Sequence, residues 1–309
     1  MNMKVLITGV HGFVGSNLVN ALAGSCTLYG LDIVAPEKEG VVRTFLWDEL
    51  SSVPEVDAII HLAGLAHDTK NQQDADRYFS VNTGLTRRIY DYFLSSRADR
   101  FIFFSTVKAV ADRVDGVLTE DIVPSPAGPY GESKLKAEEY IRDHWPVDKK
   151  VYILRPCMIH GPGAKGNLKL LYTVVKKGIP WPLAAFENRR TFTSMGNLAF
   201  VVKGLLEKEV SSGVYNMGDD EALSTNELIA IICRALGKKP HYWRIPKGLM
   251  RAAASCGGAL GLPLNPERLR KLTENYVSSN AKIKQAFGIS AMPLRAEEGL
   301  ADSIEYLNQ

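Results

Sequence analysis

The sequence lacks the features that mark several classes of protein. Its four cysteines are widely spaced, at Cys26, Cys157, Cys233 and Cys256. None forms a Cys-x-x-Cys pair, so we expect neither a disulfide framework nor a zinc site, and we expect a reducing, cytoplasmic location. The 37 basic and 34 acidic residues leave a net charge of only +3. Nucleic acid is therefore not expected as the main partner.

Long hydrophobic runs are also missing. The apolar run at the N-terminus is too short for a signal peptide and leads directly into glycines. The longest apolar stretch, residues 249–264, contains Arg251 and three glycines, and it is shorter than the roughly 18 residues that a membrane span needs. We expect no stable membrane insertion. The stretch is interpreted as a packed or interface helix, with a lip over a ligand site or a membrane-surface contact as alternatives.

What the chain has is a regular alternation of apolar segments and helical patterns. Its 309 residues are 46% apolar, enough for a large core and about two domains. Buried strands are expected at residues 4–8, 27–32, 41–46, 57–63, 101–105 and 150–154. Helical patterns lie between them, notably at residues 74–97 and 130–144. This alternation predicts an α/β fold with a doubly wound parallel sheet.

The pattern changes after about residue 160. Prolines and glycines cluster there, and helical patterns follow at residues 167–177, 224–236 and 247–260. We therefore expect a first domain over residues 1–160, to which later segments return. A smaller, mostly helical domain is expected over residues 161–309.

Three glycines follow the first expected strand in the segment Gly9-Val10-His11-Gly12-Phe13-Val14-Gly15. The first glycine permits a tight turn, the second a close approach of backbone N–H groups to a phosphate, and the third close packing of helix on strand. The helix N-terminus adds a positive dipole end. The segment predicts a dinucleotide-binding loop, with a plain turn as the alternative.

Two acidic residues extend this prediction. Asp32 ends the second expected strand, where its carboxylate can accept both hydroxyls of an adenosine ribose. A 2′-phosphate would be repelled there, so NAD is favoured over NADP; a solvated aspartate at a strand end is the alternative. Asp48 follows the third strand and either meets the adenine edge or lies in a turn.

A second set of candidate residues comprises Thr106, Tyr130 and Lys134. Tyr130 and Lys134 are four residues apart, on one face of an expected helix. An isolated tyrosine titrates near 10, too high for a base at neutral pH. A neighbouring ammonium would favour the phenolate. Thr106 follows a strand, where its hydroxyl can bind a substrate oxygen. A surface helix is the alternative for the Tyr-Lys spacing taken alone.

Together these motifs resemble the extended short-chain dehydrogenase/reductase family, in its NAD-dependent sugar-nucleotide epimerase/dehydratase branch. The resemblance runs from about residue 5 to 306. It rests on the three glycines, Asp32, His61-Leu62-Ala63-Gly64, Asn82, Ser105-Thr106, Tyr130, Lys134, and Arg155-Pro156 with Gly161-Pro162-Gly163. It implies a Rossmann domain for NAD, a C-terminal domain for a nucleoside-diphosphate sugar, and a homodimer built from helices near 80–95 and 130–144.

By position, the resemblance assigns further binding residues. Leu62, Ala63, Gly64 and Asn82 would line the cofactor, and Pro156 and Met158 would flank the nicotinamide. Asn167, Leu168 and Arg190 would lie at the diphosphate. A second phosphate-binding arginine is either Arg268 or Arg270. No metal site is expected from the histidine spacing, and His61 is interpreted as a packing residue.

One departure narrows the reaction. Sugar-nucleotide dehydratases of this family place Asp-Glu after the catalytic threonine, but this chain has Val107-Lys108. Dehydration is therefore disfavoured, and the string resembles a UDP-glucose 4-epimerase-like subgroup. The expected activity is NAD-dependent 4-epimerisation of a UDP-sugar through a 4-keto intermediate. The alternative is a 4-ketoreductase acting on a UDP-4-keto-6-deoxy-(N-acetyl)hexose in surface-polysaccharide biosynthesis. A non-catalytic dinucleotide-binding protein is disfavoured by the intact Thr106, Tyr130 and Lys134.

Overall fold

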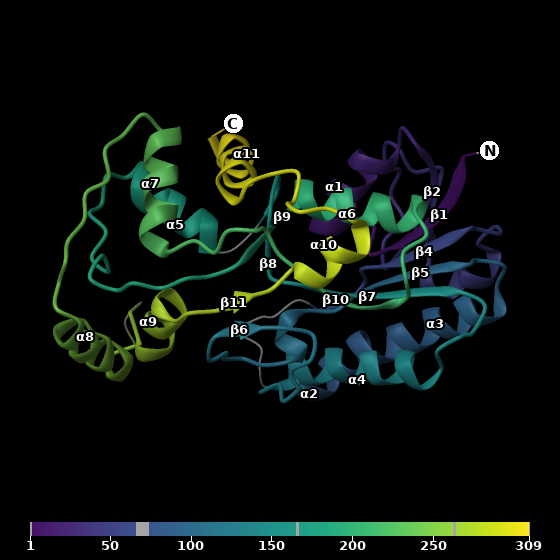
Figure 1. Cartoon of the computed structure of the whole chain (residues 1–309), viewed down its shortest axis with the longest axis horizontal. Coiled ribbons are helices and arrows are strands. Elements are labelled where there is room, and N and C mark those ends of the chain that lie inside the picture. Colours follow the sequence, from purple (N-terminus) through teal and green to yellow (C-terminus); the bar gives the residue numbers. More distant parts are fainter. Residues whose placement is uncertain (1, 66–73, 165–166, 262–263, 309) are drawn as a thin grey trace.

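A seven-stranded parallel sheet organises the molecule (Figure 1). The computed structural model describes residues 2–65, 74–164, 167–261 and 264–308. The sheet has the order β10-β7-β5-β4-β1-β2-β3. Its strands are β1 (Met3–Thr8), β2 (Cys26–Asp32), β3 (Arg43–Leu46), β4 (Ala58–His61), β5 (Arg100–Phe104), β7 (Lys150–Pro156) and β10 (Gly213–Met217). The strand order reverses between β1 and β4, so the sheet is doubly wound as predicted.

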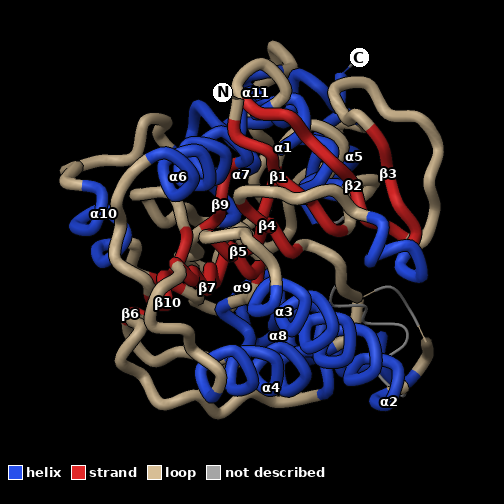
Figure 2. The backbone as a smooth tube through the Cα atoms, turned by 90° about the vertical axis from the view of Figure 1, so that its right-hand side faces the viewer, coloured by secondary structure: helices blue, strands red, loops and turns tan. Residues whose placement is uncertain are grey.

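Helices cover both faces of this sheet. On one face α1 (Phe13–Leu22), α6 (Met195–Glu207) and α10 (Ala281–Phe287) share an apolar core with β1 and β7. On the other face α3 (Leu85–Ser95) and α4 (Pro129–Asp143) pack beneath the sheet, as Figure 2 also shows. Strands buried between two helical layers are apolar on both sides; all five residues of β5 are buried. This explains the continuous apolar runs in the sequence.

The C-terminal region has a second, separate apolar core. It is built from α5 (Asn167–Lys176), α7 (Thr225–Ala235), α8 (Lys247–Ala259), α9 (Pro266–Thr273) and α11 (Ala296–Asn308). A capping box starts α7: Ser224 Oγ accepts from the Glu227 amide at 3.1 Å, and Glu227 accepts from the Ser224 amide at 2.6 Å. Two small parallel sheets lie between the two cores. They pair β6 (Val117–Leu118) with β11 (Val277–Ser278) and β8 (Met158–His160) with β9 (Phe192–Ser194).

Residues 195–217 return to the large sheet as α6 and β10. One expectation about an element needs correction. The expected single helix over 74–97 is divided into α2 (Ala75–Tyr78), a π-helical turn η2 (Phe79–Gly84) and α3. Short 3₁₀ turns, η1 (Trp47–Ser52) and η3 (Val107–Ala109), follow β3 and β5. Within the described ranges, every helix is too short or too polar to cross a membrane.

Gly15 lies in the first turn of α1, and substituting it tests whether the packing of α1 on the preceding loop requires glycine. A Cβ placed there would lie 2.3 Å from the Gly9 carbonyl oxygen, a backbone atom that cannot rotate away. We expect Gly15→Ala to lower the free energy of unfolding by about 3 kcal/mol or more, measured by denaturant unfolding. Gly24→Ala is the matched control, because no atom lies within 4 Å of its added Cβ. Equal stability of the two variants would contradict this account.

Candidate active site

The glycine loop lies at the carboxyl edge of the sheet, between β1 and α1. Gly9 has φ +70°, and a Cβ there would lie 2.9 Å from the Ala63 backbone nitrogen, at the end of β4. Gly12 is the N-cap of α1, and no side chain caps that helix end. Phe13 and Val14 form the first turn and are partly buried against the sheet. The loop therefore offers backbone N–H groups and a helix N-terminus to an anion.

Asp32 holds this loop from the end of β2. Its Oδ2 accepts from the His11 amide at 2.9 Å, and its Oδ1 accepts from the Ile33 amide at 2.7 Å. Each oxygen keeps a further lone pair for another donor. Asp32 pairs in register with Leu46 on β3, and Asp48 lies two residues further on, exposed in the first turn of η1. The two predicted carboxylates thus follow adjacent strands.

The loop after β4 completes this edge. Thr8 Oγ1 accepts from the amides of Leu62 and Ala63, at 3.2 and 3.0 Å. A Cβ on Gly64 would lie 2.8 Å from Asn82 Oδ1 and 3.2 Å from Lys134 Nζ. Gly64 therefore lets this loop approach both polar groups closely.

Asn82 is fully buried and connects two elements of the site. Its Oδ1 accepts from the Leu65 amide at 2.7 Å, and its Nδ2 donates to Ser133 Oγ at 3.0 Å. The side chain thereby fixes the loop after β4 against α4. The structure thus gives the predicted cofactor residue Asn82 a positioning role.

The predicted catalytic residues come together at the start of α4. Thr106 caps η3 after β5 and accepts from the Lys108 amide at 3.2 Å. Its hydroxyl also forms a hydrogen bond with Tyr130, which opens α4. Burial raises the pKa of Tyr130, and the bond with Thr106 opposes this rise. The sequence argument expected Lys134 to lower this pKa; in the structure burial dominates, and the group that opposes it is Thr106.

Lys134 lies one turn further along α4 and is buried. Its Nζ donates to the Phe104 carbonyl at 2.9 Å, at the end of β5. Burial lowers the pKa of Lys134 to about 8, and the nearby charge of Glu138 opposes this shift. The ammonium lies beside the loop after β4, because a Cβ on Gly64 would be 3.2 Å from Lys134 Nζ.

His61 confirms its interpretation as a packing residue. It is fully buried, and its two ring nitrogens contact Thr8 Oγ1 at 2.7 Å and Thr86 Oγ1 at 2.9 Å. Burial, together with the charge of Lys134, holds the pKa of His61 well below its usual value. Within the described ranges, no group of three or more His, Cys, Asp or Glu side chains is arranged to hold a metal.

Glu138 is the site residue that the sequence argument missed. It is fully buried one turn after Lys134 and receives two bonds from Arg155 on β7, at 2.9 and 2.5 Å. Ser105 Oγ donates to it at 2.5 Å, and Arg142 at 3.0 Å. The signal in the sequence was an acid on the same helix face as the Tyr-Lys pair. These bonds fix α4 to the strand ends beside Thr106.

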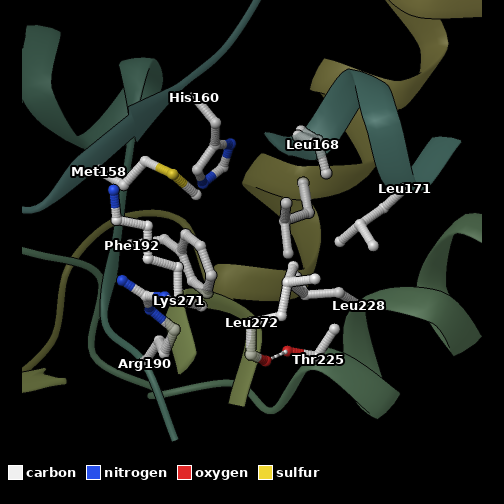
Figure 3. Close-up of a pocket in the computed structure, with 11 residues that line it drawn as sticks. Met158, His160, Leu168, Leu171, Arg190, Phe192, Thr225, Leu228, Lys271 and Leu272 are labelled. Carbon is white, nitrogen blue, oxygen red and sulfur yellow. Dashed lines mark hydrogen bonds between the residues drawn. The ribbon is translucent and has the colours of Figure 1, made fainter. Parts of the chain in front are cut away.

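Two of the predicted substrate residues, Leu168 and Arg190, line a hollow in the C-terminal region (Figure 3). Counted out to its open mouth, the hollow has a volume of about 440 Å³, and its walls come from α5, α7, α9, α11 and the β8–β9 pair. It is lined by Met158, His160, Leu168, Leu171, Arg190, Phe192, Thr225, Leu228, Lys271, Leu272 and Leu300. Pro156 ends β7 and is buried. The structure thus places Met158, Leu168 and Arg190 on the wall of one hollow.

Arg190 is the main cation of this hollow. It donates to the Lys271 carbonyl, and burial lowers its pKa against the opposing charge of Glu274. The lining contains Lys271, and neither Arg268 nor Arg270, between which the sequence argument did not choose. Asn167 begins α5, and its side chain falls outside the part that the structure describes.

A second hollow of about 270 Å³ opens beside Tyr130. Lys108 and Asp112 line it, and Lys108 Nζ lies 3.4 Å from the Asp112 carboxylate. Burial lowers the pKa of Lys108, and Asp112 opposes the shift. Lys108 therefore puts a cation where a dehydratase of the resembled family has an acidic residue.

The ion pair between Glu138 and Arg155 should stabilise the whole site. Glu138→Gln would leave Arg155 buried without a counter-charge, which costs about 3–5 kcal/mol of unfolding free energy. Denaturant unfolding measures this loss. The double variant Glu138→Gln with Arg155→Met removes both charges, so we expect it to recover much of the stability. A single-variant loss below about 1 kcal/mol, the value of an exposed pair, would contradict the assignment.

Comparison with known proteins identifies the family. The NAD dependent epimerase/dehydratase family model matches residues 5–218. The chain is 31% identical to a UDP-glucose 4-epimerase of Vibrio cholerae, over 80% of this chain and 79% of that protein. It is 26% identical to an Escherichia coli O157:H7 N-acetyl-α-D-glucosaminyl-diphospho-ditrans,octacis-undecaprenol 4-epimerase, over 92% and 86% of the two chains.

Solved structures agree with this on the fold. The UDP-N-acetylglucosamine 4-epimerase of Bacillus cereus superposes with a TM-score of 0.79, at 20% identity, over 99% of this chain and 100% of that one. The Rossmann-type α/β fold is therefore confirmed. With the matched family model and the Vibrio cholerae relative, the chain belongs to the NAD-dependent epimerase/dehydratase family of enzymes.

Proposed function

We propose that the protein is an NAD-dependent 4-epimerase of a UDP-linked hexose. The observation that carries this proposal is the hydrogen-bonded Thr106–Tyr130 pair, with Lys134 one turn away, at the sheet edge that bears the glycine loop. Relatives with 4-epimerase names support the choice of reaction. The Val107-Lys108 string disfavours dehydration, since no carboxylate follows Thr106 directly.

The residues at the sheet edge fit a dinucleotide. Cβ atoms at Gly9 and Gly15 would enter the backbone around the loop, so glycine is needed there for the tight turn and the close packing of α1 that present the amides to a pyrophosphate. Asp32 retains lone pairs that can accept the adenosine ribose hydroxyls. Gly12, Phe13 and Val14 would present the helix N-terminus. Leu62, Ala63, Gly64 and Asn82 would form the opposite wall, with Asp48 at the adenine and Pro156 and Met158 at the nicotinamide.

In the proposed mechanism, Tyr130 removes the proton of the sugar 4-hydroxyl and later returns it. NAD, when bound, supplies the hydride acceptor and donor at C4. Thr106 holds the same oxygen through its hydroxyl, which already contacts Tyr130. The ammonium of Lys134 counters the effect of burial on Tyr130 and holds the nicotinamide ribose. Rotation of the 4-keto sugar then presents its other face, so that the C4 configuration is inverted.

The C-terminal hollow is proposed to bind the nucleotide. A partly buried arginine suits a diphosphate, because its fork can bind two oxygens at once. Arg190 would take this role, with Asn167 and Leu168 at the start of α5 beside the diphosphate. Lys108 lies close enough to Arg190 that the arginine charge lowers its pKa. The positive groups thus extend from the nucleotide hollow to the hollow beside Tyr130.

The runner-up reaction is one-way reduction of a UDP-4-keto-6-deoxy sugar. A relative named GDP-6-deoxy-D-mannose reductase, 25% identical over 75% of this chain, supports this class of chemistry. It would use the same Thr106, Tyr130 and Lys134. We further propose that the enzyme acts in the cytoplasm as a homodimer, formed through α3 and α4.

The deciding experiment is incubation of the purified enzyme with UDP-glucose or UDP-N-acetylglucosamine without added reductant. We expect the C4 epimer to form, as seen by NMR.

Tyr130→Phe should bind the sugar nucleotide but lose turnover by about 10² or more, because the proton-transfer group is gone. Tyr306→Phe, which removes an exposed phenol on α11, is the control. Consumption of a UDP-4-keto-6-deoxy sugar with matching loss of NADH, and no epimer, would establish the reductase instead.

Asp32 should determine the choice of cofactor. Its carboxylate repels a 2′-phosphate, so calorimetry should show tighter binding of NAD than of NADP. We expect Asp32→Ala to narrow this difference by about tenfold, or about 1.4 kcal/mol. Glu37→Ala removes an exposed carboxylate of the following loop and should leave the ratio unchanged. Preference of the wild-type enzyme for NADP would remove Asp32 from this role.

A further inference from the structure

One part of the chain departs sharply from the overall charge balance. Residues 228–266 contain no aspartate or glutamate. They contain six basic residues: Arg234, Lys238, Lys239, Arg244, Lys247 and Arg251. Because the whole chain carries only +3, the rest of the molecule is net negative. This segment therefore concentrates positive charge in a protein whose remaining residues carry a net negative charge.

The fold places this charge at one end of the molecule. In Figure 1 the chain leaves α7 and runs along the outer edge of the C-terminal region to α8, at the end remote from the large sheet. Backbone bridges join Tyr242 to Trp181 and Arg244 to Leu183. Lys238 Nζ donates to the carbonyls of Val175 and Lys176. These contacts bring the end of α5, with Lys176 and Lys177, beside the basic segment.

We call the resulting area the basic end surface. Its cations are Lys176, Lys177, Lys238, Lys239, Arg244, Lys247 and Arg251, all of them exposed. Among the described residues, none of these seven forms an ion pair with a carboxylate, whereas neighbouring Arg234 pairs with Glu297. Unpaired cations of one sign on one face create a positive potential that attracts an anionic partner.

Large apolar side chains are interleaved with these cations. Trp243 is 56% exposed, Leu249 62% and Ile179 51%. Helix α8 buries only Met250, Ala254 and Gly257, so most of its surface faces outward. Cations mixed with tryptophan and aliphatic residues are typical of surfaces that lie in the headgroup region of a bilayer. A phosphate backbone would engage the cations but would give Leu249 and Ile179 no apolar partner.

We propose that the basic end surface docks reversibly on a membrane that carries anionic lipid headgroups. The lysines and arginines contact the headgroup phosphates, and Trp243 and Leu249 enter the boundary with the acyl chains. Helix α9 contacts α8 and supplies Lys271 and Leu272 to the wall of the hollow around Arg190, so the hollow adjoins the docked region. Docking therefore holds this hollow near the bilayer. The inference goes beyond the proposed reaction and does not depend on it.

Sedimentation of the full chain with lipid vesicles tests the proposal. At about 0.1 M salt, where the screening length is about 10 Å, we expect binding to phosphatidylcholine vesicles that contain phosphatidylglycerol and none to phosphatidylcholine alone. Lys239→Glu with Arg251→Glu should weaken binding by about tenfold or more, since each basic residue near an anionic surface contributes substantially. Trp243→Ala should also weaken it, including at higher salt, because its contribution is apolar.

A matched control separates the surface from the overall charge. Lys203→Glu with Lys282→Glu reverses two exposed charges on α6 and α10, away from the basic end surface. This variant should bind vesicles like the wild type, and thermal unfolding should show all variants folded. An equal loss in the control, or no wild-type binding to anionic vesicles, would overturn the proposal. Binding of an oligonucleotide without binding of vesicles would also overturn the proposal. The same holds for self-association of the protein that Trp243→Ala abolishes, if the wild type does not bind vesicles.

Discussion

The buried ion pair between Glu138 and Arg155 is the constraint on which the arrangement of the site depends. A carboxylate without water needs its lone pairs filled, and Glu138 meets this need with donors from three places: Arg155 on β7, Ser105 after β5 and Arg142 on its own helix. These contacts fix helix α4 to the strand ends. Since Tyr130 and Lys134 precede Glu138 by two turns and one turn, their positions follow from the same contacts.

The same carboxylate also acts on the site electrostatically. Burial alone would push the pKa of Lys134 down and favour the neutral amine. The negative charge of Glu138 opposes this shift, and the value settles at about 8, so the ammonium persists at neutral pH. A positive Lys134 is what the proposed mechanism needs, because the pKa of the buried Tyr130 is raised. Structural and electrostatic roles thus coincide in one residue.

The sequence was informative wherever function is carried by local spacing. The glycines at positions 9, 12 and 15 and the Tyr-Lys pair are short-range patterns whose geometry a single turn or helix determines, and the structure places them as expected. The course of residues 195–217 was not predictable in this way. Strand β10 joins the sheet only beside β7, a partner more than fifty residues away. Its sequence pattern is short, and nothing local indicates which sheet it completes.

Contacts between distant parts of the chain also explain why the sequence did not indicate Glu138 and Lys271 as site residues. Glu138 occupies a helical position where a solvated acid would be ordinary, and only its contact with Arg155 across the sheet edge makes it structural. Likewise, Lys271 reaches the hollow because the Arg190 side chain bonds its carbonyl from another part of the fold. In the hollow, Arg190 donates to a carbonyl and is partly buried, and Lys271 pairs with Glu267. The cations of the basic end surface face outward without carboxylate partners in the described part of the chain. The fold thus keeps two positively charged regions apart, the hollow around Arg190 and the basic end surface. The region proposed for the diphosphate is enclosed and suits directed hydrogen bonds to one ligand, and the region proposed for the membrane is spread over an open surface.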